Sequence, residues 1–169
     1  DLKKDPRLEY ILIFKNHGSA AGASLRHPHS QLIAMPMVPI RLKQETTGAS
    51  QYFDYKERCV YCDIIRQEST DQMRVVAQNR DFIAFTPFAS RFPFELWVLP
   101  LRHSSDFQDI QKLEIASLAS MMKNVFSKQT YVLDNPPFNF ILHTAPLKTP
   151  NLLHFHWYIE IIPKLTKVA

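Results

Sequence analysis

The sequence predicts an α+β fold in which one long helix packs on an antiparallel sheet. Runs of β-forming residues at 74–77, 82–85 and 95–99 are separated by turns, as in a strand meander. Between residues 111 and 128, apolar side chains recur with the period of an amphipathic helix, at 115, 118, 119, 122, 125 and 126. Two more strand-like runs, 138–142 and 155–162, follow the helix. Strands grouped around one long helix favour an α+β architecture.

The first third of the chain predicts two strands joined by a flexible loop. Residues 9–14 and 31–38 are rich in β-forming side chains. Residues 16–24 hold two of the chain's three glycines among small side chains, so this loop's backbone can approach a ligand closely. Residues 40–56 are polar and weakly helical, and the pattern allows either a helix or a linker.

A His-x-His pattern occurs twice, each time at the predicted start of a strand. Alternation places both histidines of a pair on one face of the strand. The two occurrences are His27-x-His29-x-Gln31 and His154-x-His156-x-Tyr158. We therefore expect two related units: the tail of an incomplete first repeat with a linker (1–57), and a second, more complete domain (58–169). On this basis the chain is expected to be part of a longer protein.

Composition is that of a globular protein, gives no argument for nucleic acid as a partner and is compatible with a small anionic substrate. The 169 residues are 46% hydrophobic and 21% charged, which is enough apolar material for a core. The net charge of +4 is spread without a basic run, so nucleic acid is not an expected partner, and a membrane is not expected as a partner either. No membrane-length apolar stretch or signal peptide is visible. The two cysteines, Cys59 and Cys62, suit a reducing compartment, and we expect a cytoplasmic location.

His29 is the candidate nucleophile. A neutral imidazole attacks phosphorus when one ring nitrogen is free and a hydrogen bond fixes the other. Gln31, on the same strand face, could donate an amide N–H to a phosphoryl oxygen. The loop from Asn16 to Ser24, which includes Gly22, could add backbone N–H groups and the Ser24 hydroxyl. The alternative, two histidines in an ordinary turn, is disfavoured by this loop and by Gln31.

Cys59-x-x-Cys62 predicts half of a tetrahedral zinc site. His103 and His154 are the candidate third and fourth ligands, and a site closed by four protein ligands would be structural. Free thiols or a redox pair are the alternatives. A competing ligand set contains a carboxylate and three histidines: Glu45, His103, His154 and His156. His17 and His143 are expected at the surface or at strand ends rather than at a metal.

At these residues the sequence resembles the galactose-1-phosphate uridylyltransferase family, a branch of the histidine-triad superfamily. The matching segments run nearly from end to end and are specific in combination: Asn16, residues 21–25, residues 27–31, residues 94–100 with His103, and residues 154–157. The resemblance implies a histidine-triad-like domain preceded by the last strands of a first repeat.

The resemblance also implies ping-pong nucleotidyl transfer. His29 would attack the α-phosphorus of a nucleotide sugar, release a sugar 1-phosphate and carry the nucleotide, expected to be uridylyl, to a second phosphate acceptor. Gln31, Ser24 and Asn16 match positions that contact the phosphates or the reacting histidine. The implied partners are a nucleotide sugar and a sugar 1-phosphate, and a homodimer is a candidate assembly.

Two metal sites are implied by the resemblance. His27 matches a ligand of a first zinc site whose other ligands belong to the first repeat and are absent before residue 27. At the second site, some members use a Glu and three His, whereas others, including plant ADP-glucose phosphorylases, use two Cys and two His. Cys59 and Cys62 favour the second type. Tyr158 stands where simple histidine-triad hydrolases have a third His, which argues against catalysis by the second repeat.

Three functions remain open at this stage. The leading one is uridylyl transfer between a nucleotide sugar and a hexose 1-phosphate. The second is an ADP-glucose phosphorylase-like adenylyltransferase with phosphate or sulfate as acceptor. The third is a zinc-stabilised nucleotide-binding module without turnover.

Overall fold

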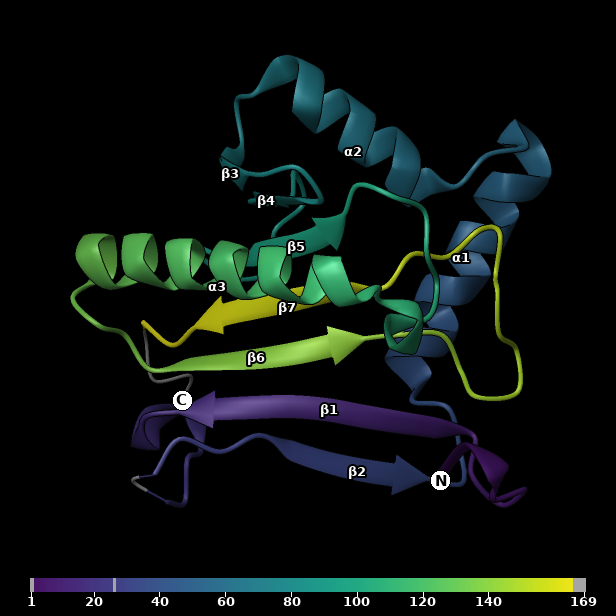
Figure 1. Cartoon of the computed structure of the whole chain (residues 1–169), viewed down its shortest axis with the longest axis horizontal. Coiled ribbons are helices and arrows are strands. Elements are labelled where there is room, and N and C mark those ends of the chain that lie inside the picture. Colours follow the sequence, from purple (N-terminus) through teal and green to yellow (C-terminus); the bar gives the residue numbers. More distant parts are fainter. Residues whose placement is uncertain (1, 26, 166–169) are drawn as a thin grey trace.

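The computed structural model describes residues 2–25 and 27–165 and confirms the α+β architecture (Figure 1). Seven strands form one sheet in the order β2-β1-β6-β7-β5-β4-β3. Every neighbouring pair is antiparallel. The strands are β1 (Tyr10–His17), β2 (Gln31–Met35), β3 (Val75–Gln78), β4 (Phe82–Phe85), β5 (Leu96–Pro100), β6 (Phe138–His143) and β7 (Tyr158–Pro163).

The two N-terminal strands join the same sheet as the rest of the chain. β1 pairs with β6, with Asn16 opposite Asn139, and β2 forms the edge beyond β1, with Phe14 opposite Gln31. The predicted boundary at residue 57 falls in the short link between α1 (Ile40–Lys56) and α2 (Val60–Asp71). The sheet crosses this boundary, and the division into two repeats stays a prediction.

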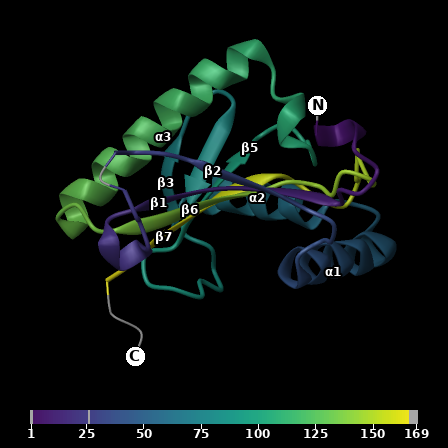
Figure 2. The same cartoon turned by 90° about the horizontal axis from the view of Figure 1, so that it is seen from below.

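Helices cover both faces of the sheet. In Figure 2, α3 (Lys112–Leu133) lies on one side, and α1 and α2 lie on the other. Residues 40–56, predicted as either a helix or a linker, form α1. The N-terminus of α3 is fixed where the backbone N–H of Gln111 donates to Glu114 Oε2 at 2.8 Å. The described residues also form three short 3₁₀ turns: η1 (Leu2–Lys4), η2 (Ser19–Ala21) and η3 (Phe107–Asp109).

Strand β7 begins later than the sequence predicted. The strand was expected over 155–162, but sheet pairing starts with Tyr158 opposite His143. The reason is that the backbone N–H of Trp157 donates to the carbonyl of Ser104 at 2.9 Å, in the loop after β5. His154 and His156 therefore precede the strand, and the expectation that they share one strand face is wrong.

Two hydrophobic clusters follow from the two sheet faces. Alternate residues of the central strands point toward α3, where Trp157, Ile161 and Val98 pack with Met121 and Val125. The opposite face packs against α1 and α2, with the large buried side chains Tyr158, Phe85, Leu99, Phe155 and Tyr61. Among the described residues, no helix combines the length and hydropathy that a membrane span needs.

Candidate functional site

The His-Pro-His segment lies between the loop after β1 and the start of β2. His29 Nδ1 lies 2.9 Å from the carbonyl oxygen of His27. A carbonyl can only accept a hydrogen bond, so Nδ1 carries the proton and donates it. The neutral ring then has a free lone pair on Nε2. This is the tautomer that a nucleophilic histidine requires, and it is fixed by the backbone two residues away.

The loop before this segment is held by a pair of asparagines facing each other across β1 and β6. Asn139 Nδ2 donates to Asn16 Oδ1 and to the carbonyl of Ala21, each at 2.8 Å. Asn16 Nδ2 donates in turn to the carbonyl of Gly22 at 3.4 Å. Gly22 has φ +82°, a conformation that side chains rarely adopt. The loop is therefore pinned to the sheet by side-chain amides, and its own curvature depends on glycine.

This loop encloses a hollow of about 290 Å³. Asn16, Ser24 and His27 line it, together with the neighbouring residues His17, Gly18, Ser19, Ala23, Leu25 and Pro28. Ser24 and His27 are exposed, and His29 is half-buried. Gln31 is the first residue of β2, opposite Phe14. The structure thus brings most of the predicted phosphate-binding residues to one end of β1 and β2.

A second site is formed by Cys59, Cys62 and His103. One ligand atom from each of these residues lies within 4.8 Å of the others. His103 Nδ1 lies 3.3 Å from Cys62 Sγ, and His103 Nε2 lies 3.3 Å from the carbonyl of Leu152. A proton on Nε2, donated to Leu152, leaves Nδ1 free to bind a metal. Hydrogen bonding from Cys62 lowers the pKa of Cys59 to about 4, against the opposing effect of burial.

Two histidines, His154 and His156, are candidates for the fourth ligand of this cluster. The carbonyl oxygen of His154 lies 3.5 Å from Cys59 Sγ, while its ring lies beside Phe53. His156 is fully buried, its ring is 5.3 Å from that of His103, and no described group hydrogen bonds to its Nε2. Burial lowers the pKa of His156 to about 4, so its ring is neutral at pH 7. A tetrahedral zinc ion fits two thiolates, the free Nδ1 and one further imidazole.

Glu45, a ligand in the alternative metal set, lies elsewhere. It belongs to a buried network around Glu160, whose carboxylate is 0% exposed. Arg41 donates to Glu160 at 2.9 Å, Arg91 at 2.8 Å and His143 Nε2 at 3.0 Å. Glu45 pairs with Arg41 at 2.8 Å and with His143 Nδ1 at 3.4 Å. The described part of the chain therefore does not bring Glu45 together with His103.

This network was missed from the sequence. His143 ends β6, as a strand-end residue was expected to, but it is buried and stacks on Tyr158 with ring centroids 4.3 Å apart. Burial alone would lower the pKa of His143, but Glu160 and Glu45 raise it above the usual value. Burial opposes the lowering of the pKa of Glu160, and its hydrogen bonds to His143 and Arg41 outweigh burial. A charged residue in a buried strand, Glu160, was the available signal.

Comparison with known families gives two matches. The model of the C-terminal domain of galactose-1-phosphate uridyl transferase matches residues 45–168. A second model, the N-terminal part of the domain of unknown function DUF4931, matches residues 1–38.

Curated relatives match nearly the whole chain. ADP-glucose phosphorylase of Arabidopsis thaliana is 35% identical over 164 residues, which are 96% of this chain and 45% of that protein. Galactose-1-phosphate uridylyltransferase of Thermotoga maritima is 33% identical over 165 residues, covering 96% and 51%. A solved structure of the Arabidopsis phosphorylase with bound ADP-glucose superposes with a TM-score of 0.91 at 33% identity, covering 99% of this chain and 54% of the other. The chain spans about half the length of the curated relatives it matches.

Proposed function

Because the chain belongs to the galactose-1-phosphate uridylyltransferase family, we propose that it carries the nucleophile of a nucleotidyltransferase. The observation that carries this proposal is the hydrogen bond from His29 Nδ1 to the carbonyl of His27, at 2.9 Å. It leaves the lone pair of Nε2 free, on a residue that follows a loop suited to phosphate. The names of the relatives support the same chemistry, since they are uridylyltransferases and a phosphorylase of a nucleotide sugar.

The first half-reaction forms one bond and breaks one. His29 Nε2 attacks the α-phosphorus of a nucleotide sugar, and the bond from that phosphorus to the bridging oxygen breaks. Sugar 1-phosphate leaves with the electron pair, and a nucleotidyl-histidine remains. The ring becomes cationic in this step, and the His27 carbonyl stabilises it through Nδ1–H. Gln31, Ser24 and the backbone around Gly22 would donate hydrogen bonds to the phosphoryl oxygens, with Asn16 holding the loop in place.

In the second half-reaction an oxygen of a second phosphate attacks the same phosphorus. The nitrogen–phosphorus bond breaks, and its electron pair returns to His29 Nε2. With hexose 1-phosphate as acceptor the product is a new nucleotide sugar, and the enzyme is a uridylyltransferase. With orthophosphate the product is a nucleoside diphosphate, as in phosphorolysis of ADP-glucose. Two observations support phosphorolysis as the alternative function: the 35% identity to the plant phosphorylase and the Cys59-x-x-Cys62 pair.

Product analysis of the complete protein separates these functions. We expect UDP-glucose with galactose 1-phosphate to yield UDP-galactose and glucose 1-phosphate, and His29→Ala to abolish this exchange. ADP and glucose 1-phosphate formed from ADP-glucose and phosphate, without the uridylyl exchange, would instead establish the phosphorylase. Binding of both nucleotide sugars without any product would contradict enzyme function and support a nucleotide-binding module.

We propose zinc as the metal of the second site. Cys59, Cys62 and His103 would hold it, with His154 or His156 as the fourth ligand. Zinc bound by four protein ligands supplies no open position and ties α2 to the loop after β5 and the segment before β7. His27 remains the proposed ligand of a first metal site. Elemental analysis of His154→Ala and His156→Ala variants tests which histidine is needed, since only the true ligand's loss lowers the zinc content.

Location and assembly are part of the same proposal. Free Cys59 and Cys62 and the small polar substrates favour the cytoplasm. A homodimer is the proposed assembly. Light scattering of the complete protein checks the dimer, and a monomer mass at all concentrations would contradict it.

A further inference from the structure

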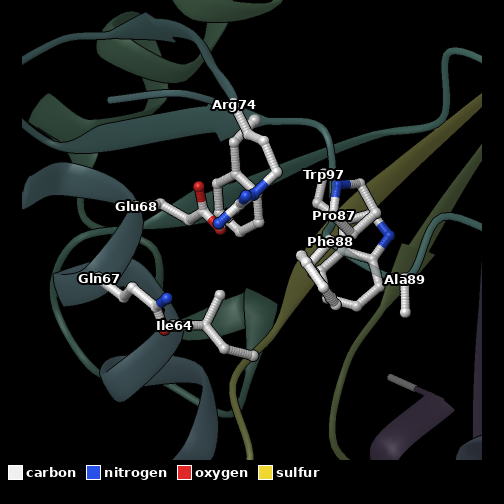
Figure 3. A pocket seen from close by; sticks show the side chains of 9 residues that line it. Ile64, Gln67, Glu68, Arg74, Pro87, Phe88, Ala89 and Trp97 are labelled. Atoms are coloured by element: carbon white, nitrogen blue, oxygen red, sulfur yellow. Dashed lines mark hydrogen bonds and ion pairs between the residues drawn. The ribbon is translucent and has the colours of Figure 1, made fainter. Parts of the chain in front are cut away.

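The hollow before His29 is held together by two distant parts of the chain. A cavity of about 360 Å³ between α2 and the segment after β4 differs in this respect, because its lining residues all fall between positions 64 and 97 (Figure 3). The loop around the hollow, residues 16–24, is instead bonded to a residue of β6 that lies 118 to 123 positions further along the chain. The proposed transfer chemistry assigns no role to β6.

The backbone of the loop passes directly against the start of β6. A Cβ placed on Gly18 would lie 2.9 Å from the Cβ of Pro137, so the chain approaches this proline as closely as a glycine allows. The ring of the next residue, Phe138, stacks on His17 with centroids 4.9 Å apart. Pro137 and Phe138 therefore fix the position at which the chain leaves β1 and enters the loop.

Asn139 fixes the loop itself by hydrogen bonds. Its Nδ2 donates to Asn16 Oδ1 and to the carbonyl of Ala21, each at 2.8 Å. An amide nitrogen carries two protons, so each bond uses one of them. Ala21 is buried and Asn139 is half-buried, so both bonds are partly shielded from water. Without the Asn139 side chain, neither acceptor keeps this donor.

Asn139 lies on the same face of the sheet as the proposed phosphate contacts. It is opposite Asn16, and Phe14 is opposite Gln31. Paired residues share a face and side chains alternate along a strand, so Asn16, Gln31 and Asn139 lie on one face. From this face a side chain of β6 can set the shape of the loop without belonging to it.

We propose that Asn139 is a positioning residue for nucleotidyl transfer, which holds residues 16–24 in the shape that receives the α-phosphate. This inference rests on the proposed function. Donors to the phosphoryl oxygens act most strongly in the transition state, and a displacement of about 1 Å in such a site can cost about 100-fold in rate. Loss of Asn139 should therefore slow the chemical step. A purely structural role would reduce the fraction of folded protein and leave the rate of the folded fraction unchanged.

Single-turnover labelling of the complete protein separates the two roles. UDP-glucose and ADP-glucose, labelled at the α-phosphorus, are each offered, and the one that labels the wild type is used at saturation. We expect Asn139→Ala to lower the rate constant for nucleotidyl-His29 formation about 10–100-fold, with the final labelled fraction unchanged. Asn139→Leu, which keeps the branched shape of the side chain and removes its donors, should slow the reaction to the same extent.

Asn79→Ala is the matched control. Asn79 also bonds an amide side chain to the backbone, since its Nδ2 donates to the Ser117 carbonyl at 3.0 Å and its Oδ1 accepts from Phe82 N–H at 2.8 Å. It lies in the turn between β3 and β4, at the other end of the sheet. This variant should keep the wild-type rate constant.

Three results would overturn the proposal. A wild-type rate constant in both Asn139 variants would show that the loop does not need this side chain. A smaller labelled fraction at an unchanged rate constant would assign Asn139 a purely structural role. Equal slowing in Asn79→Ala would show that the effect is not specific to the loop. Absence of the adduct from the wild type would contradict the proposed function itself, and the positioning role with it.

Discussion

Substituting Glu160 by glutamine removes the charge at the centre of the buried network. Its carboxylate accepts hydrogen bonds from Arg41 Nη2 at 2.9 Å, Arg91 Nη2 at 2.8 Å and His143 Nε2 at 3.0 Å. Glutamine keeps the shape and one acceptor oxygen, but its amide N–H₂ faces the same donors. Two cations and a protonated histidine would then lie near a neutral side chain.

The expected loss of stability follows from how well each partner is shielded from water. A hydrogen bond to a charged group contributes about 1.5–3 kcal/mol. The full value applies to His143, whose side chain is 7% exposed. Arg41 and Arg91 have side chains 33% and 47% exposed, so solvent screening reduces their contributions to about 0.5–1 kcal/mol each. Glu160→Gln should therefore lower the free energy of unfolding by about 3 kcal/mol, within the range for breaking a buried pair.

Urea unfolding at several pH values measures this loss. The pKa of His143 is raised above its usual 6.5, so its protonated form stabilises the fold below about pH 6.5 and this contribution is lost as the pH rises through the raised pKa. The difference between wild type and Glu160→Gln should be largest near pH 6 and narrow above it. Asp54→Asn, at an exposed site on α1, is the control. A loss below 1 kcal/mol, or a difference independent of pH, would refute the account of this network.

Three other variants test the remaining contacts. His143→Gln should flatten the dependence of unfolding free energy on pH between 6 and 8, and a curve parallel to wild type would show that another group titrates. Cys59→Ser should lower bound zinc from about one ion per chain by elemental analysis; zinc retained at the wild-type level would exclude this site. Asn139→Ala leaves Asn16 Oδ1 and the Ala21 carbonyl without their donor and should cost about 1–2 kcal/mol. Hydrogen exchange should then be faster in the loop after β1, and unchanged protection there would show that the loop does not depend on these amides.

The sequence predicted the elements whose signal is local. The α3 helix follows from apolar spacing within one segment, although it extends to Leu133, beyond the predicted end. The zinc-binding candidates Cys59 and Cys62 are one helical turn apart, so their meeting needs no tertiary information. The hydrogen bond of the His29 ring is also local, because its partner is the carbonyl of His27, two residues away.

The parts that were missed depend on contacts between distant residues. Arg41 and Glu160 are 119 residues apart in sequence, and their pairing needs α1 to pack on β7. The start of β7 was misplaced because the backbone at Trp157 bonds to Ser104 in a loop instead of a strand. The carbonyl oxygen of His154 lies 3.5 Å from Cys59 Sγ, and the role of its ring as the fourth ligand stays a prediction. Periodicity in the sequence indicates on which face of a helix or strand a side chain lies. It carries no information on which distant residue that side chain or its backbone will contact.

The most direct test of the central claim is to find where the nucleotide is attached. The complete protein is incubated with UDP-glucose or ADP-glucose, digested under mildly alkaline conditions that preserve a phosphoramidate, and mapped by peptide mass spectrometry. We predict a nucleotidyl group on His29, labile to acid, absent from the His29→Ala variant and discharged by adding hexose 1-phosphate or phosphate. A nucleotidyl group on another residue, or turnover that persists in His29→Ala, would contradict the account.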